Sequence, residues 1–293
     1  TACNQLASAA SRAGNHAESA RFYAMAVQVK PADHNLLVRL GESQMQAGKK
    51  AEARDSLIRA LAVLPAELHW QAKLNPLLSF ARTVEKPDDW AMVNDSAVPD
   101  TFVTESAAFL REVWQDRFDR AFTIASSIEQ RLKTDGLFSQ VVALRFSTVR
   151  PFGPGYFLAF LKTFPSAEYL DWAVDTYAAK FPAEKRDEVR NTLPPVLDEI
   201  VRKSGSSRAG QKAYLRLMEM RFLGLPETVE TARQKINMCD EFRRLYPSSE
   251  WTVQILTTEA QLLSDQLGEH QRALELYQAA VTTSGRKALL RHV

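Results

Sequence analysis

The sequence predicts an all-α protein, a right-handed superhelix of packed helical hairpins. Three prolines, Pro31, Pro65 and Pro99, lie 34 residues apart, and the residues between the first two repeat in phase. Apolar residues recur at helical spacing along most of the chain, whereas the alternating pattern of half-buried strands is almost absent. A fixed period with helical spacing predicts a repeat stack, in which each hairpin buries its apolar face against its neighbours.

Residues 1–65 carry two copies of one hairpin pattern. Aligning Gly14 with Gly48 pairs residues of similar character: Leu6 with Leu40, Ala7 with Gly41, Tyr23 with Leu57 and Ala26 with Ala60. Small residues let the two helices of a hairpin approach closely, and the large ones fill the gap between hairpins. Each glycine suits the left-handed conformation that ends a first helix, and Pro31 and Pro65 stop the second helices.

This spacing of small residue, glycine, alanine and terminal proline resembles the tetratricopeptide repeat family, over residues 1–65. Two positions depart from the family pattern, because Cys3 stands where an aromatic is usual and Ser19 replaces a small alanine. The resemblance implies a scaffold whose concave face, lined by the first helices, holds a peptide or a partner protein.

In the repeat frame, polar and apolar side chains fall on the concave face of the first helices. These candidate binding residues are Asn4, Ser8, Arg12, Val38, Glu42, Met45 and Gln46, with Asn35 and Arg39 beside them. Amides and arginines there can pair with the backbone and the charges of an extended segment. Side chains that are simply solvated would fit the same positions, so both interpretations stay open.

Residues 66–150 keep the repeat frame only in traces, and we expect degenerate helical hairpins there. Asn75 occupies a close-packing position, and Pro87 falls inside an expected second helix. The apolar spacing of 104–113 and 118–132 predicts a further hairpin that turns at residues 115–117.

The sharpest break in the chain is Pro151-Phe152-Gly153-Pro154-Gly155, and two more segments follow it. We expect a helical middle region over 151–205 and C-terminal helical repeats over 206–293, ending in a hairpin that restores the repeat spacing. Helices in this half end on an aromatic residue before proline, at Phe164, Phe181 and Tyr246. Such endings are similar to those of helical-repeat proteins of bacterial envelopes.

The stretch 202–212 is the best candidate for a linker. It contains Gly205 and Gly210 at the spacing of a phosphate-binding loop, but Gln211 stands where the catalytic lysine belongs and Lys212 where the magnesium-binding hydroxyl belongs. No strand pattern precedes it, so a solvated loop between helices is the favoured interpretation, and we expect no cofactor.

Composition narrows the function classes further. The 293 residues carry a formal net charge of +2, which favours neither nucleic acid nor an anionic membrane as partner. No apolar run approaches the roughly 20 residues that span a bilayer, and no signal peptide is evident. The sequence begins inside a repeat hairpin, so we expect a natural start further upstream.

The two cysteines are too far apart in sequence to indicate a metal cluster or a disulfide framework. Cys239 lies on an apolar stripe, so we expect a buried thiol. Thr1-Ala2-Cys3 looks like the end of a bacterial lipobox, whose cysteine carries a lipid anchor. Cys3 is also in phase with the first repeat helix, which favours a packing role instead.

No sequence pattern of a hydrolase, a zinc site or a dithiol occurs, so we expect a protein-binding scaffold rather than an enzyme. The favoured setting is bacterial cell-envelope assembly, secretion or polymer export, in the cytoplasm or the periplasm. One alternative is a peptide-sensing module of a larger regulator. A second is an enzyme with a site in 151–180, which would need a deep pocket near 156–172 and carboxylates such as Asp171 or Asp175 with perturbed pKa values.

Overall fold

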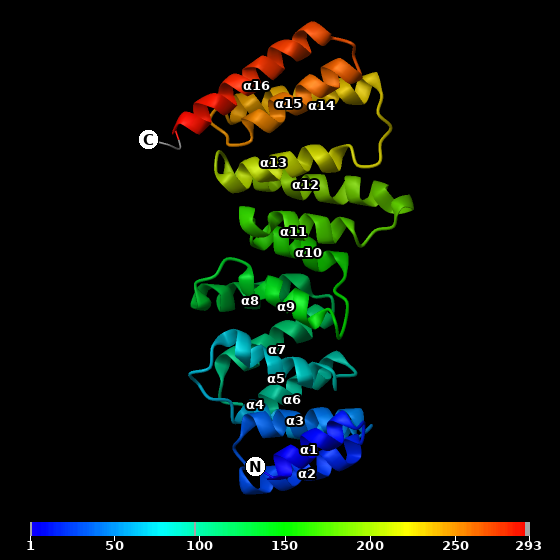
Figure 1. Cartoon of the computed structure of the whole chain (residues 1–293), viewed down its shortest axis with the longest axis vertical. Helices are drawn as coiled ribbons and strands as arrows, with labels where there is room; N and C mark the ends of the chain where they lie inside the picture. The colour runs from blue at the N-terminus through cyan, green and yellow to red at the C-terminus, as the bar shows by residue number, and fades with distance from the viewer. Residues whose placement is uncertain (1, 97, 291–293) are drawn as a thin grey trace. The chain divides into compact units, whose positions relative to one another are not determined.

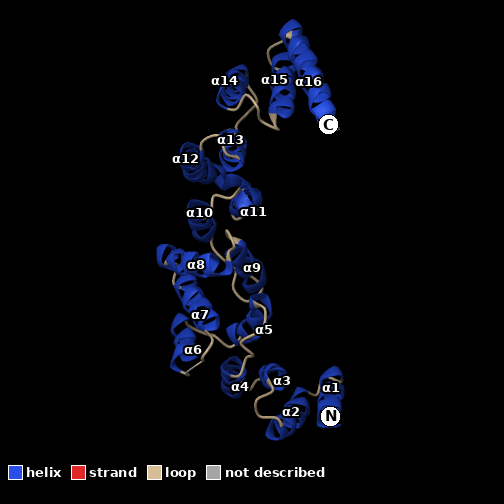
Figure 2. Ribbon diagram, turned by 90° about the vertical axis from the view of Figure 1, so that its left-hand side faces the viewer, coloured by secondary structure: helices blue, strands red, loops and turns tan. Residues whose placement is uncertain are grey.

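The protein is helical throughout the residues that the computed structural model describes, 2–96 and 98–290 (Figure 1). Sixteen α-helices and two short 3-10 helices make up these ranges, and they include no strand (Figure 2). Helices that follow one another pack as neighbouring pairs, which confirms the all-α, helical-repeat prediction. The right-handed superhelical twist stays a prediction.

Contacts divide the chain into two compact units, Thr1–Ala159 and Phe160–Val293. The division falls within helix α10 (Pro154–Thr163), just after the proline-glycine break seen in the sequence. The four predicted segments, 1–65, 66–150, 151–205 and 206–293, stay predictions. None of the helices in the described ranges combines the length and the apolar character that crossing a bilayer requires.

The first unit begins with the two predicted hairpins. Their helices are α1 (Ala2–Arg12), α2 (His16–Val29), α3 (His34–Gln46) and α4 (Lys50–Ala62). Gly14 and Gly48 have φ of 76° and 79°, which confirms the left-handed turns that end the first helices. Asn15 and Asp33 then begin α2 and α3, because each side chain accepts a hydrogen bond from a first-turn amide.

Small residues do place the helices of these hairpins close together. A Cβ at Gly41 would lie 2.5 Å from Leu57 Cγ and 3.1 Å from the carbonyl oxygen of Ala53, both on α4. Ser19 stands where the repeat pattern has a small alanine, and a hydrogen bond explains this difference. Its buried hydroxyl lies 3.1 Å from the hydroxyl of Ser43. Two buried hydroxyls that bond each other avoid the cost of an unpaired polar group.

The rest of the first unit is less regular. Its elements are α5 (Trp70–Ala81), the 3-10 helix η1 (Pro87–Trp90), α6 (Ala91–Asp95), α7 (Thr101–Trp114), α8 (Phe118–Leu132) and α9 (Leu137–Phe146). Pro87 begins η1 instead of breaking a longer helix. The hairpin of α7 and α8 turns at 115–117, where Asp116 has φ of 56°, which confirms that prediction.

Aromatic residues form the core where α7, α8 and α9 meet the start of α10. The Phe109 ring packs on those of Phe122, Phe138 and Tyr156 at centroid distances of 6.1, 5.5 and 6.3 Å. The Tyr156 hydroxyl donates to the carbonyl oxygen of Ser139, 2.7 Å away. The crowded aromatic residues of the middle region are all buried: Phe152, Tyr156, Phe157, Phe160 and Phe164.

The second unit continues with helical pairs. Its elements after α10 are α11 (Ala167–Ala178), the 3-10 helix η2 (Ala183–Lys185), α12 (Arg186–Ser204), α13 (Arg208–Arg221), α14 (Val229–Leu245), α15 (Thr252–Asp265) and α16 (His270–Leu290). The predicted linker at 202–212 is wrong, because α12 and α13 pack along each other and only residues 205–207 separate them. Within this stretch only residues 205–207 form a loop between helices, and Gly210 is a buried residue of α13.

The close approach of α3 and α4 gives a stability test. In Gly41→Ala the added methyl would overlap Leu57, so we expect the free energy of unfolding of the first unit to fall by about 1–3 kcal/mol. Urea unfolding followed by circular dichroism measures this change. The matched control is Gly153→Ala, where a Cβ meets nothing within 4 Å. Equal stability of the two variants would show that α3 and α4 do not need this close contact.

Candidate functional site

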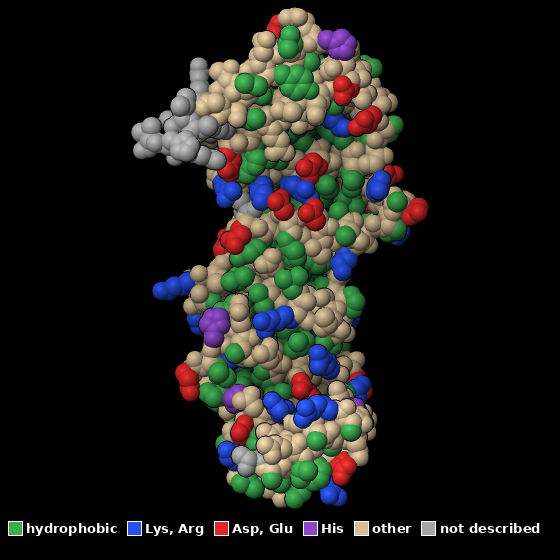
Figure 3. Space-filling view, in the orientation of Figure 1, with side chains coloured by type: hydrophobic (Ala, Val, Ile, Leu, Met, Phe, Trp, Pro, Cys, Tyr) green, Lys and Arg blue, Asp and Glu red, His purple; other side chains and the backbone are tan. Residues whose placement is uncertain are grey.

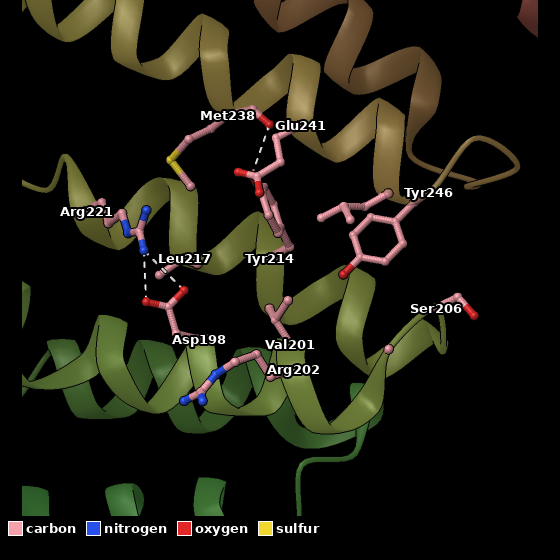
Figure 4. A pocket seen from close by; sticks show the side chains of 12 residues that line it. Asp198, Val201, Arg202, Ser206, Tyr214, Leu217, Arg221, Met238, Glu241 and Tyr246 are labelled. Carbon is pink, nitrogen blue, oxygen red and sulfur yellow. Dashed lines mark hydrogen bonds and ion pairs between the residues drawn. The ribbon is translucent and has the colours of Figure 1, made fainter.

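A groove of about 520 Å³ crosses α12, α13 and α14 in the second unit (Figure 4). Residues from three helices and one turn line it: Asp198, Val201, Arg202, Gly205, Ser206, Tyr214, Leu217, Arg221, Met238, Glu241, Leu245 and Tyr246. Apolar, aromatic and charged side chains of both signs therefore meet in one concavity. Such a mixture is typical of sites that bind an organic ligand or a segment of another protein.

The tight turn between α12 and α13 builds one end of the groove. Gly205 has φ of 51°, and a Cβ at Gly210 would lie 2.3 Å from the Gly205 carbonyl oxygen. No side chain fits at Gly210, so the two backbones touch there. Ser207 accepts a hydrogen bond from the Gly210 amide and begins α13. The two glycines that resemble a phosphate-binding loop thus have a packing role.

Tyrosines form the aromatic wall of the groove. The Tyr214 ring lies 5.7 Å from Phe242 and 6.1 Å from Tyr246, measured between ring centroids. Its hydroxyl donates to Glu241 Oε2, 2.6 Å away, and lies 3.3 Å from the Met238 carbonyl oxygen. Burial and the neighbouring Glu241 carboxylate raise the pKa of Tyr214 well above its usual value, so this phenol stays protonated at neutral pH.

The charged residues of the groove differ in how they are paired. Arg221 binds both carboxylate oxygens of Asp198, at 2.8 and 3.1 Å (Figure 4). Arg202 has no hydrogen bond and no ion pair within the described residues, although its charge adds to that of Lys203 in lowering the pKa of Glu199. An arginine in a groove without a partner is available for a ligand carboxylate.

Sequence reasoning missed this groove because its residues come from separate helices. One signal was present, since the aromatic-proline ending of α14 places Tyr246 in the wall. The pairing of Tyr214 with Glu241 and of Arg221 with Asp198 has no local pattern in the sequence. Groups of histidine, cysteine and carboxylate side chains that could hold a metal ion are absent from the part of the chain that the structure describes.

The residues predicted for the N-terminal face lie in three places. Asn4 lines a cavity of about 170 Å³ with residues of α2 and α3, whereas Glu42 and Gln46 line another of about 300 Å³ that also borders α5. Asn35 and Arg39 are exposed and line neither cavity. Asn4 and the pair Glu42 and Gln46 therefore line two different cavities, and the binding role of the predicted residues stays a prediction.

Several of these predicted residues already have partners inside the protein. Glu42 accepts a hydrogen bond from the Ser79 hydroxyl at 2.7 Å, which ties α3 to α5. The Ser8 hydroxyl lies 3.1 Å from that of Tyr23, and Arg12 donates to the Ser8 carbonyl oxygen at 3.3 Å. Val38 and Met45, the two apolar residues among those predicted to bind a partner, are half-buried.

The carboxylates of the alternative site in 151–180 form ion pairs with α13. Asp171 lies 2.6 Å from Lys212, and Asp175 pairs with Arg216. Figure 3 shows acidic and basic side chains mixed over this part of the surface. These pairs connect α11 with α13 and give both carboxylates a packing role.

The two cysteines have different surroundings. Cys239 is buried, as predicted, and burial together with Glu259 raises the pKa of its thiol to about 12. Cys3 lies in α1 and is half-buried. The lipobox hypothesis also involves Thr1, which lies outside the described residues, so that hypothesis stays untested.

Comparison with known proteins yields no matching family model and no match among curated proteins. The resemblance to the tetratricopeptide repeat family therefore depends on the residue spacing of 1–65 and stays a prediction.

The buried phenol of Tyr214 predicts a pH effect on stability. The pKa of Tyr214 is raised in the folded state, whereas a tyrosine of the unfolded chain has a pKa of about 10. Below that pH both states keep the proton, so the full stability is present. Above it only the unfolded state loses the proton, and stability falls by about 1.4 kcal/mol per pH unit.

The variant Tyr214→Phe has no phenol to ionise at this position. We therefore expect its free energy of unfolding to fall less steeply with rising pH, between about pH 10 and about pH 11, than that of the original protein. Urea unfolding at a series of pH values measures the slope. At neutral pH the same change removes the bond to Glu241 and costs about 1 kcal/mol. Identical alkaline slopes for the variant and the original protein would contradict the assignment.

Proposed function

We propose that this protein is a non-enzymatic helical-repeat scaffold that binds an extended segment of a partner protein in the groove across α12, α13 and α14. The observation that carries the proposal is the lining of that groove, where an aromatic wall and an unpaired arginine face one concavity. Stacked helical repeats present such concave surfaces to their partners.

The shape and chemistry of the groove favour a peptide with two kinds of side chain. Leu245, exposed to 40%, and the half-buried Val201 offer apolar surface in the groove, on which an aliphatic or aromatic side chain would be buried. Arg202 offers an unpaired guanidinium, which binds carboxylates through two parallel hydrogen bonds. A segment with an apolar residue next to an acidic one fits both features.

The resemblance of residues 1–65 to tetratricopeptide repeats supports the same class of function. The predicted face with Glu42 and Gln46 is a second place where a partner could bind, and it provides a comparison for the experiment. A setting in the bacterial cell envelope is part of the proposal, supported by the aromatic-proline helix ends alone.

A displayed library of random peptides selected against the whole chain tests the proposal. We expect enriched peptides that pair apolar with acidic residues. Synthetic copies labelled with a fluorophore, followed by anisotropy, should lose about tenfold in affinity for Arg202→Glu, which corresponds to about 1.4 kcal/mol.

The matched control is Lys203→Glu, which makes the same charge change one residue away but does not line the groove. We expect this control to bind the peptides almost as the original protein does. Equal losses in the two variants would indicate a long-range charge effect and contradict the groove. If only the double variant Glu42→Ala/Gln46→Ala loses affinity for the peptides, the binding site lies on the N-terminal face instead. If the selection enriches no peptide, peptide binding itself is contradicted.

A further inference from the structure

Tyr246 carries a hydroxyl group that the fold does not use. Its side chain is only 5% exposed and lines the groove across α12, α13 and α14. The hydroxyl has no hydrogen-bond partner among the described residues. Figure 4 shows it pointing away from α14, toward the α12 side of the groove. A nearly buried polar group without a partner costs free energy, and a ligand that bonds it removes that cost.

Tyr246 is held in place through both its ring and its backbone. The ring centroid lies 4.9 Å from that of Phe242 and 6.1 Å from that of Tyr214. The Tyr246 amide donates to the Phe242 carbonyl oxygen at 2.8 Å, and its own carbonyl oxygen accepts from the Ser249 amide at 3.1 Å. Pro247 restricts the backbone that follows. The hydroxyl therefore has a defined position before any ligand binds, which lowers the entropic cost of binding.

Packing at this helix end does not require a hydroxyl. The chain places an aromatic residue before proline near three helix ends, and the other two residues are Phe164 and Phe181. Phe164 is buried as deeply as Tyr246, with 5% of each residue exposed. Tyr214, the other tyrosine of the groove, donates its hydroxyl to Glu241 at 2.6 Å. Tyr246 differs from both comparisons, because its hydroxyl is present but has no partner among the described residues.

The surroundings of the Tyr246 hydroxyl indicate which ligand group it would bind. Burial and the nearby Glu241 carboxylate raise the pKa of Tyr246, so the phenol keeps its proton at neutral pH and can donate it to a hydrogen bond. The same negative charge repels a ligand carboxylate at this point. A neutral carbonyl oxygen avoids that repulsion, and every peptide bond of an extended segment offers one. Arg202 on α12 has the opposite charge and suits the acidic side chain of the segment instead.

We infer that the Tyr246 hydroxyl donates a hydrogen bond to a backbone carbonyl oxygen of the segment bound in the groove. This inference rests on the proposed function and adds the contact that holds the backbone of the partner, whereas Arg202 and the apolar residues select its side chains. A backbone contact does not depend on the sequence of the segment, so it strengthens the binding of every peptide that the groove accepts. It also fixes which peptide bond lies at the end of α14.

Removing only this hydroxyl from the whole chain tests the inference. The probes are the fluorophore-labelled peptides that the selection enriches, and anisotropy measures their affinity. We expect Tyr246→Phe to bind each of them about threefold to tenfold more weakly, as the loss of one hydrogen bond predicts. The midpoint of urea unfolding should not fall, because the hydroxyl has no partner among the described residues.

Tyr177→Phe is the matched control in the same unit. The Tyr177 hydroxyl forms a hydrogen bond with that of Thr192, and neither residue lines the groove. This variant should keep the peptide affinity and unfold at a lower urea concentration, which is the opposite pattern. A lower midpoint for Tyr246→Phe would show that the fold itself uses the Tyr246 hydroxyl, and it would overturn the inference.

Peptides in which one backbone amide at a time is replaced by an ester identify the carbonyl group. An ester carbonyl oxygen accepts a hydrogen bond more weakly than an amide carbonyl oxygen does. At one position the ester should weaken binding to the original protein without adding to the loss in Tyr246→Phe. Additive losses at every position would contradict the assignment of a backbone carbonyl.

The variant Arg202→Glu separates this inference from the proposed function. If Arg202→Glu loses affinity and Tyr246→Phe does not, the groove binds the segment without this hydroxyl, and the inference alone is wrong. If neither variant loses affinity, or the selection enriches no peptide, the proposed function fails and the inference fails with it.

Discussion

Within each unit, hairpins stay folded because they bury apolar faces against neighbouring helices, and this nearest-neighbour packing is the constraint on which the other features depend. The N-terminal cluster shows it most clearly, since Tyr23 and Val27 of α2 are covered by leucines of α3. Most helices here are too short to be stable alone in water, so their stability comes from this contact.

Close contact between two helices requires small residues, and glycines provide it in both units. Gly41 lets α3 and α4 touch, and the Gly205–Gly210 contact does the same for α12 and α13. In the irregular part of the first unit, aromatic rings around Phe109 and Tyr156 fill the space instead. The hydroxyl of Tyr156 keeps its hydrogen bond to Ser139 in that core, which avoids the cost of burying an unpaired polar group.

The groove across α12, α13 and α14 follows from the same packing. The turn at 205–207 holds α12 and α13 together, and Tyr214 joins α13 to α14 through Glu241. Side chains that support the walls are thus paired within the protein, whereas the Arg202 side chain has no hydrogen bond or ion pair among the described residues. A rigid wall with an unpaired charge binds a flexible segment at a smaller entropic cost than a mobile wall would.

The sequence by itself determined the elements whose causes are local. Glycine, proline and apolar spacing predicted the hairpins of 1–65 and the turn at 115–117, because these signals act within a few residues. Tertiary structure decided what depends on distances between separate helices. It showed that a tight turn at 205–207, and not a linker over 202–212, joins α12 and α13, and that Tyr214, Arg202 and Glu241 share a groove. Periodicity reports which face of a helix is apolar, but whether another helix covers that face is a property of the folded chain.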